Sequence, residues 1–376
     1  MGSASLVRTA PPFRADQVGS LLKPRALIEA WKAREKREIS EDKFREIEEA
    51  AVRAVVKLQE ELGFKSVTDG EFSRSGWQRD FLVGFANVKI VPTSVKMRFH
   101  TEDGATDMIP PGLFVAGKLA RPRPIFIDAF RFLRSVTNAV PKITIPSPSL
   151  MHFRGGRKSV DETAYPDIEE FYADLARVYA EEIADLGRNG CTSLQIDETN
   201  FAYLCDPRLR EQVRAIGEDP DQLPHTYARL INNSIAGKPA NMTVCMHLCR
   251  GNANSAWVAE GGYEPVAETL FNEIGITGYF LEYDSDRAGG FEPLRFVPKG
   301  KIVVLGLVTT KKGKLETKDE LKRRIDEAAK FLPLEQLALS PQCGFSSTLE
   351  GNKITVEEEI AKLKLIVDTA RDVWGD

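Results

Sequence analysis

The chain has 376 residues, of which 42% are hydrophobic and 28% charged, as expected for a globular protein with material for a sizeable core. Its formal net charge of −4 argues against a nucleic-acid-binding protein, because such proteins usually carry a basic excess. No stretch approaches the roughly 18 consecutive apolar residues of a membrane helix, and the N-terminus lacks the apolar run of a secretion signal. We therefore expect a cytoplasmic protein that binds neither nucleic acid nor membrane.

Short runs of aliphatic and β-branched residues that end in polar or turn residues predict strands. Eight segments have this pattern: residues 13–20, 66–71, 143–148, 193–198, 242–248, 278–284, 302–308 and 337–343. Their apolar stretches are nearly continuous, which is typical of parallel strands buried on both faces. Stretches with helical periodicity lie between them, most clearly at residues 25–62, 168–186, 207–236, 318–331 and 356–374.

The alternation of strand and helix, repeated to eight strands, predicts a (β/α)8 TIM barrel, an α/β fold, formed by a single domain over residues 1–376. A doubly wound open sheet is the structural alternative, but no GxGxxG motif follows the first strand. Residues 73–142 depart from the pattern, because KIVPTSVKMRFH at residues 89–100 is typical of an antiparallel β-hairpin. We expect this excursion after the second strand to be an insertion over one face of the barrel.

Polar residues follow the predicted strands at the point where each strand ends. In a parallel barrel these C-terminal ends meet at one mouth, where barrel enzymes have their active sites. Six placements on one rim are hard to obtain from packing alone, so we interpret these residues as a functional site. They are Ser20, Glu71, Asp197, His247, Glu282 and Cys343.

His247 and Cys249 in MHLCRGN are two residues apart, so both side chains point to the same side of an extended strand end. Alone, this spacing is better explained by a core histidine beside a buried cysteine. Cys343 in SPQCGF and Glu282 in FLEYD would add a second sulfur and a carboxylate from other strands. Two thiolates, an imidazole and a carboxylate suit tetrahedral Zn²⁺ better than Mg²⁺ or Ca²⁺. Ligands scattered over three strands indicate a site built by the fold rather than by a local loop.

The sequence has five cysteines, an odd number that does not indicate a disulfide framework in a large chain of this kind. Three of the five fall at no motif position, and we expect them to be buried structural thiols. They are Cys191, Cys205 and Cys245.

The segments VGS, VTDGEF, LQIDET, MHLCRGN, FLEYD and SPQCGF together resemble the catalytic barrel of cobalamin-independent methionine synthase. The chain is more similar to the single-barrel members of that family, and the resemblance extends from Phe13 to Trp374. The resemblance implies that four residues are zinc ligands, namely His247, Cys249, Glu282 and Cys343.

The resemblance also implies a substrate site. Ser20 and the backbone at Gly19 would lie near the carboxylate of a homocysteine-like substrate, and Glu71 and Asp197 would hold its ammonium group. The residue types agree with this assignment, since two carboxylates at a barrel mouth need a cation.

A free thiol has a pKa near 8.5, whereas coordination to zinc deprotonates a thiol and fixes its orientation. We therefore infer a zinc-dependent S-methyltransferase that makes methionine from homocysteine through a zinc-bound thiolate, with no protein nucleophile. Its partners would be a small-molecule thiol and a methyl donor. The sequence sets no oligomeric state, and both a homo-oligomer and a partner protein that delivers the methyl group stay open.

Two departures from the family leave the methyl donor open between a methylfolate, methylcobalamin and another donor. We expect the protein to lack the duplicate N-terminal barrel that contributes to folate binding in the full-length synthases. In addition, ETNFAYLCD at residues 198–206 stands where the full-length family has a proline-containing segment.

Further residues near the predicted mouth have both a functional and a structural interpretation. Arg14 and Asp16 beside the first strand would bind substrate anions or form a structural ion pair. Trp77 would cover the mouth or pack on the barrel rim. Arg79 would help Trp77 to cover the mouth. A donor pocket would be lined by Trp77, His152, Phe153 and Trp257. The hydroxyls of Thr309 and Thr310 would contact a ligand.

Two other functions remain as alternatives. An alkyltransferase could use another thiol, such as coenzyme M, to open an epoxide, although that thiol carries a sulfonate and has no amine for Glu71 and Asp197. A non-catalytic protein could store or sense zinc or a thiol, and a closed metal site without an exchangeable position would support this case.

Overall fold

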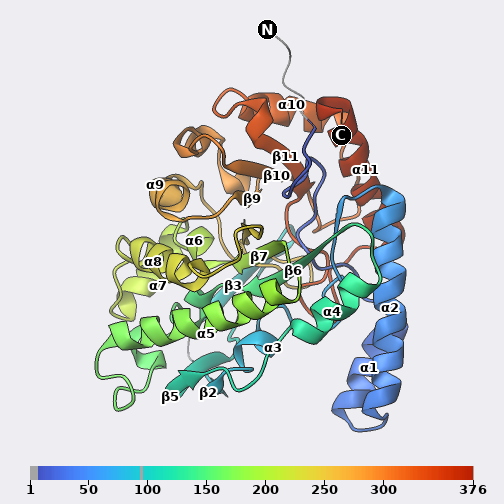
Figure 1. Cartoon of the computed structure of the whole chain (residues 1–376). Helices are drawn as coiled ribbons and strands as arrows, with labels where there is room; N and C mark the ends of the chain where they lie inside the picture. Colours follow the sequence, from blue (N-terminus) through green and yellow to red (C-terminus); the bar gives the residue numbers. More distant parts are fainter. Residues whose placement is uncertain (1–6, 94–95, 376) are drawn as a thin grey trace.

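The computed structural model describes residues 7–93 and 96–375, and its centre is a curled parallel β-sheet of seven strands (Figure 1). Every neighbouring pair of strands in this sheet is parallel. The strand order is β1-β6-β7-β8-β9-β10-β11. The bounds are β1 Ser66–Val67, β6 Val140–Pro146, β7 Ser193–Glu198, β8 Thr243–Leu248, β9 Gly278–Glu282, β10 Ile302–Val308 and β11 Leu337–Pro341.

The N-terminal segment lies between the two edge strands of this sheet, where the first predicted strand would lie. Ala15 forms an isolated parallel bridge with Leu339 of β11, and the Thr68 hydroxyl after β1 donates to the Gly19 carbonyl at 2.7 Å. The segment forms no continuous ladder, because the Asp16 carboxylate accepts hydrogen bonds from the backbone amides of Phe13 and Gln17. The prediction of a strand over residues 13–20 is therefore wrong, although the segment takes the expected place.

The second predicted strand, residues 66–71, is shortened for a related reason. β1 ends at Val67, and the chain then turns through positive φ values at Gly70 (68°) and Glu71 (60°). The Asp69 carboxylate stabilises this turn by accepting from the Glu71 amide at 2.9 Å. As a result, Glu71 lies at the C-terminal end of the sheet.

Helices surround the sheet as an outer layer, with the α1–α2 hairpin along one side and α5, α8 and α9 along another (Figure 1). Their inward faces are apolar at helical spacing, as in α5, where every third or fourth residue from Phe171 to Leu186 is buried. The bounds are α1 Arg25–Glu35, α2 Glu41–Leu62, α3 Arg79–Leu82, α4 Ile127–Ser135, α5 Ile168–Arg188, α6 Asn200–Tyr203, α7 Pro207–Ala215, α8 Leu223–Ile235, α9 Glu264–Glu273, α10 Lys318–Ala328 and α11 Val356–Trp374.

Two of the long predicted helices are each divided in two. The predicted helix at residues 25–62 breaks where Arg37 adopts a positive φ of 60°, and Ser40 then caps α2 through the Lys43 amide. The predicted helix at residues 207–236 breaks between α7 and α8 at Gly217, whose φ is 91°. Helical periodicity alone did not reveal either turn.

Two antiparallel strand pairs lie between β1 and β6. β2 (Ala86–Val91) pairs with β5 (Gly112–Ala120), and β3 (Met97–Thr101) pairs with β4 (Gly104–Met108). The hairpin predicted within residues 89–100 is therefore wrong in its pairing, because its two halves have different partners, and residues 94–95 lie outside the described chain. His100 of β3 also exchanges two backbone hydrogen bonds with Trp257, which joins this region to the loop after β8.

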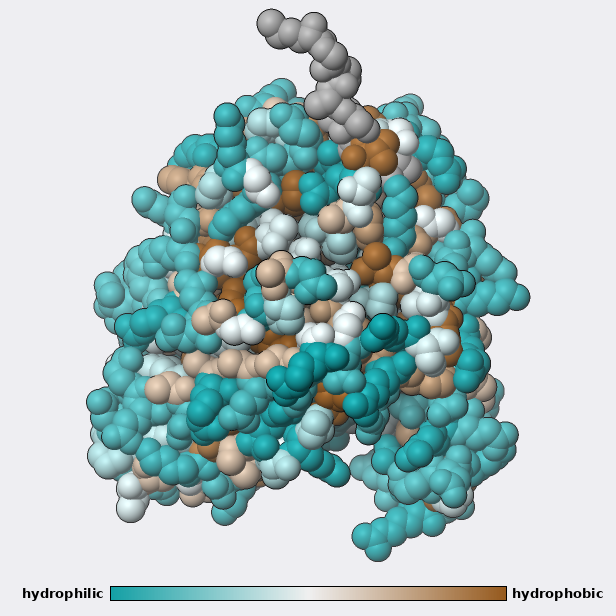
Figure 2. Space-filling model, viewed as in Figure 1, coloured by the Kyte–Doolittle hydropathy of each residue, from teal (hydrophilic) through white to brown (hydrophobic). Residues whose placement is uncertain are grey.

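Among the described residues, no helix is long and apolar enough to cross a membrane. The face shown in Figure 2 is largely hydrophilic, with hydrophobic residues scattered between charged ones. Scattered apolar residues of this kind are normal on a protein surface.

Candidate metal centre

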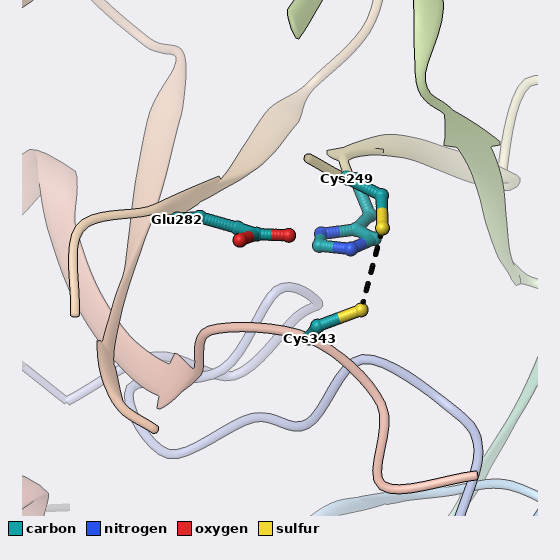
Figure 3. A group of neighbouring side chains, drawn as sticks. Cys249, Glu282 and Cys343 are labelled. Carbon is teal, nitrogen blue, oxygen red and sulfur yellow. Dashed lines mark hydrogen bonds between the residues drawn. The ribbon is translucent and has the colours of Figure 1, made fainter. Parts of the chain in front are cut away.

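Four side chains from three strands of the sheet, β8, β9 and β11, converge at its C-terminal end. His247 lies at the end of β8 and Cys249 just after it, Glu282 ends β9, and Cys343 follows β11. One ligand atom from each of these residues lies within 4.8 Å of the others. Figure 3 shows Cys249, Glu282 and Cys343 reaching toward one another from separate segments. The structure thus brings together the four residues that the sequence analysis names as metal ligands.

The geometry and the burial of these groups fit a metal ion. Two sulfurs that each lie 2.3 Å from a tetrahedral zinc ion are about 3.8 Å apart, and the Sγ atoms of Cys249 and Cys343 are 3.5 Å apart. The His247 side chain is buried, and within the described chain no nitrogen or oxygen atom forms a hydrogen bond with its ring nitrogens. A buried polar atom without a partner is costly, and a metal ion would satisfy one of these nitrogens.

Glu282 is held by donors on both of its carboxylate oxygens. Oε1 accepts from the Arg250 amide at 2.9 Å, and Oε2 accepts from Gln342 Nε2 at 3.0 Å and Arg287 Nη2 at 3.1 Å. Burial acts to raise the pKa of Glu282, but the charges of Arg287, Lys311 and His247 bring it below its usual value. The residue is therefore a carboxylate at neutral pH. Thr310, a predicted ligand contact, instead donates to Gln342 Oε1 at 2.9 Å.

The two cysteines of the site differ in their ionisation. A hydrogen bond from Cys249 holds the pKa of the Cys343 thiol well below its usual range, whereas the pKa of Cys249 is raised by the same contact and by burial. The Gly251 amide donates to the Cys249 sulfur at 3.3 Å. One of the two sulfurs is therefore ready to bind a metal ion as a thiolate.

A cavity of about 240 Å³ opens beside this centre and has two further carboxylates in its wall. Glu71 accepts a hydrogen bond from the Thr144 hydroxyl at 3.0 Å, and Asp197 accepts one from Gln195 at 2.7 Å. Burial raises the pKa of both carboxyls, and the nearby Glu71 helps to bring that of Asp197 to about 7. Arg74 and Lys23 partly offset the effect of burial on Glu71. Two buried carboxyls, one of which raises the pKa of the other, are typical of a site that can accept a cation.

Ser20 and Gly19 lie against these carboxylates. Gly19 has a φ of 149°, and a Cβ at this position would lie 2.8 Å from the Thr144 methyl and 3.1 Å from Glu71 Oε1, so only glycine fits. Ser20 lines the cavity, and its Oγ accepts from the Ser346 amide at 3.2 Å. The hydroxyl hydrogen of Ser20 is therefore able to donate to a ligand.

Several predicted site residues lie elsewhere. Arg14 is buried with its guanidinium on the carbonyls of Glu335 and Leu337, at the start of β11 and so at the opposite end of this strand from Cys343. The prediction that Arg14 binds substrate conflicts with this position. Asp16 forms a buried ion pair with Lys142 at 2.7 Å, which is the structural alternative foreseen for it.

The donor-pocket candidates divide in the same way. Trp77 lines the cavity beside the metal centre. His152 is buried, with one ring nitrogen 3.0 Å from the Tyr227 hydroxyl and the other 3.4 Å from Glu218, and it is not part of the cavity wall. Trp257 stacks on His100 and donates to Glu260, also outside this wall.

Arg154 is a cavity residue that the sequence analysis missed, although it directly follows Phe153 after the third predicted strand. It lines the main cavity and an apolar side chamber of about 360 Å³, and Met97 and Tyr203 separate the two spaces with it. Burial lowers the pKa of its guanidinium, which forms no ion pair with the described residues. A signal was present in the sequence, namely a cation just after a strand that ends at the mouth.

The other three cysteines are core residues. Cys191, Cys205 and Cys245 are buried as free thiols, and burial raises the pKa of each to about 12. Cys245 packs inside the barrel with Val18 and Phe280. The prediction that these cysteines are structural is confirmed.

The fold and the site define a class of protein: a parallel α/β barrel-like sheet with a nitrogen, sulfur and carboxylate centre at the C-terminal ends of its strands. Residues 13–372 match the family described as the catalytic domain of cobalamin-independent synthase, and the chain belongs to this family of methionine synthase-like methyltransferases.

Relatives of the chain cover nearly its whole length. The uncharacterized protein YxjH of Bacillus subtilis is 44% identical over 96% of this chain and 95% of its own. A methionine synthase of Pyrococcus abyssi is 28% identical over 95% of this chain and 92% of its own. A solved structure named for a vitamin-B12-independent methionine synthase from Listeria monocytogenes has a TM-score of 0.77 and 36% identity, and covers 98% of this chain and 100% of its own.

Proposed function

We propose that this protein is a zinc-dependent methyltransferase that transfers a methyl group to the sulfur of homocysteine and so makes methionine. The observation that carries the proposal is the shared cavity, because its wall contains the carboxylate pair and three of the four metal-ligand candidates, His247, Cys249 and Cys343. The fourth candidate, Glu282, has a ligand atom within 4.8 Å of those of the other three. The metal centre would bind a thiol, and the carboxylate pair would bind an ammonium group. Homocysteine has both groups, together with a carboxylate.

His247, Cys249, Glu282 and Cys343 would hold the ion. When bound, zinc lowers the pKa of a coordinated thiol, so it would supply the acceptor as a thiolate at neutral pH. Arg287 and Gln342 keep the Glu282 carboxylate ionised and oriented from behind. These contacts also give the carboxylate partners if an incoming thiol loosens its bond to the ion.

The remaining cavity residues would orient the acceptor. Glu71 and Asp197 would bind its ammonium group, and the free hydroxyl hydrogen of Ser20 would donate to its carboxylate. The tight packing of Gly19 on Glu71 keeps this part of the wall close to the backbone. Anchoring both groups of the α-carbon would leave the side chain free to direct its sulfur toward the metal centre.

The methyl donor would enter from the side of Arg154. This cation, which has no ion pair within residues 7–93 and 96–375, and the apolar chamber next to it suit a donor that has both an apolar and an anionic part. A methylfolate has both parts, and the family assignment also points to this donor. We therefore propose a methylfolate as the methyl donor. In the same proposal the whole chain acts as one barrel domain, with the β2–β5 region as a cover over its mouth.

Isothermal titration of the zinc-loaded protein tests the acceptor. Homocysteine is expected to bind, whereas coenzyme M, which has a sulfonate and no amine, is expected to bind at least tenfold more weakly because it lacks a partner for Glu71 and Asp197. Stronger binding of coenzyme M would favour the epoxide-opening alternative. Binding of neither thiol would favour a zinc-storage role.

A product assay tests the reaction itself. The zinc-loaded protein is incubated with homocysteine and, in turn, with methylfolate mono- and triglutamates and methylcobalamin, and methionine is measured by mass spectrometry. A metal-free sample is the control. If homocysteine binds but no methionine forms with any of these donors, the assignment of the donor class is refuted.

A further inference from the structure

Lys311, in the loop after β10, is anchored entirely on uncharged oxygens. Its Nζ donates to Asn252 Oδ1 at 2.7 Å and to the carbonyls of Gly251 and Ala256, each at 3.2 Å. All three acceptors belong to the loop after β8, which begins with Cys249. The contacts therefore join two loops at the mouth of the barrel.

Asn252 continues this connection to a third loop. Its Nδ2 donates to the Gly344 carbonyl at 2.8 Å and to the Ser347 hydroxyl at 3.0 Å, both in the loop after β11. Gly344 directly follows Cys343. Asn252 is a buried residue, 8% exposed. Its side-chain oxygen contacts the loop after β10, and its side-chain nitrogen contacts the loop after β11.

The connection reaches the sulfur atoms through short stretches of backbone. Gly251, whose carbonyl accepts from Lys311, donates its amide to the Cys249 sulfur at 3.3 Å. This glycine has a φ of 92°, and a Cβ would lie 2.8 Å from Val258, so the local backbone has little freedom. Cys249 and Cys343 are 94 residues apart in the chain, and the distance between their sulfurs depends on how these loops are held.

We propose that Lys311 and Asn252 form a clasp that sets the positions of Cys249 and Cys343 for metal binding. Both are positioning residues, since they act through the backbone next to the two cysteines. The inference rests on the proposed metal role of these cysteines. Outer contacts that orient metal ligands typically change metal affinity by about 10- to 100-fold.

A purely electrostatic role of Lys311 is the alternative mechanism, because its charge acts to lower the pKa of both Cys249 and Glu282. The Asn252→Ala substitution separates the two mechanisms, since it breaks the clasp without changing any charge. Lys311→Met breaks the clasp and removes the charge. Lys312→Met is the matched control, because its neighbouring ammonium makes only an exposed ion pair with Glu102.

Zinc affinity is measured by competition with a chromophoric chelator for the wild type, Lys311→Met, Asn252→Ala, the double variant and Lys312→Met. Each clasp variant is expected to bind zinc about tenfold more weakly, the double variant no more weakly than the weaker single variant, and Lys312→Met like the wild type. Such non-additivity is the mark of residues that act as one unit. Wild-type affinity in Asn252→Ala, or additive losses in the double variant, would overturn the clasp.

Cobalt substitution gives a second readout that does not depend on activity. The sulfur-to-metal absorption bands of the Co²⁺ protein are expected to weaken and broaden in Lys311→Met and Asn252→Ala. If either variant fails to fold, Asn252→Asp is used, because it keeps an oxygen for Lys311 and loses the donor to Gly344 and Ser347. Its added negative charge would favour zinc, so a weaker zinc affinity would come from the lost donor. Unchanged bands and zinc affinity in Asn252→Asp would then overturn the proposal. If the wild type itself binds no zinc, the proposed function fails, whereas zinc-binding wild type with unchanged variants refutes the clasp alone.

Discussion

Replacing Asp197 by Asn tests the proposed ammonium site, because the substitution keeps the shape of the side chain and removes its charge. Asp197 is 6% exposed and lines the cavity beside His247. Burial and the neighbouring Glu71 raise its pKa to about 7. Close to half of the Asp197 carboxyls are therefore ionised at neutral pH before any ligand binds.

The size of the effect follows from these contacts. A hydrogen bond to a charged group contributes about 1.5–3 kcal/mol. Ionising a carboxyl whose pKa equals the pH costs about 0.4 kcal/mol, which leaves about 1–2.5 kcal/mol for Asp197. The Asp197→Asn variant should therefore bind homocysteine about five- to 70-fold more weakly than the wild type at pH 7.

Isothermal titration with two ligands measures this loss. The second ligand is 4-mercaptobutanoate, which has the thiol and the carboxylate of homocysteine but no ammonium group. Asp197→Asn should weaken only homocysteine binding, and Asp128→Asn is the control, because the Asp128 side chain is 99% exposed. Equal weakening of both ligands would refute the reasoning, since the loss could then not come from the ammonium group.

The same pair of ligands reports the pH dependence. Below about pH 7 Asp197 is protonated and loses its attraction for a cation, so homocysteine affinity relative to 4-mercaptobutanoate should rise as the pH increases through about 7. The ratio of the two affinities removes the ionisation of the thiol, which both ligands share. The ratio should rise less steeply in Asp197→Asn, where Glu71 is the carboxyl of the pair that still titrates. An unchanged slope in this variant would contradict the assignment.

Three further predictions follow from other residues. Cys343→Ala should lower zinc affinity in chelator competition by more than the roughly 10- to 100-fold typical of outer contacts, and wild-type affinity would contradict a shared site. Arg154→Ala should raise the KM for an anionic methyl donor about tenfold or more and leave homocysteine titration unchanged, whereas unchanged donor kinetics would remove Arg154 from the donor site. Burial raises the pKa of Glu359 to about 8, so this carboxyl destabilises the fold increasingly as the pH rises from its unfolded value toward 8. Glu359→Gln should therefore raise the thermal midpoint at pH 9 but not at pH 4, and an equal change at both pH values would contradict this cause.

Strand positions β6 to β11 were predictable because each is a short apolar run between helical segments, and burial on both faces demands such runs. The failures arose from side chains that compete with the backbone. Asp16 takes the amides of Phe13 and Gln17, and Asp69 takes the amide of Glu71, so the first two predicted strands are interrupted or shortened. Such competition is not visible in a pattern of apolar residues.

Only part of the candidate site could be predicted from the sequence. His247, Cys249, Glu282 and Cys343 could be named because few arrangements other than a metal site explain these residue types at the ends of three strands of one sheet. Arg14 was misplaced because its position near the first strand does not say toward which end of the barrel its side chain points.

The amino-acid sequence by itself determined the order of the barrel elements and the chemical types that reach its mouth, because apolar runs and motif residues are local properties. Only the tertiary structure decided which polar groups share one cavity and which are used elsewhere. Arg154 has no ion pair in the part of the chain that the structure describes, and Asn252 joins loops that are 92 residues apart in the chain. Such relations depend on how the sheet curls and how its loops pack, and these long-range contacts leave no periodic trace in the sequence.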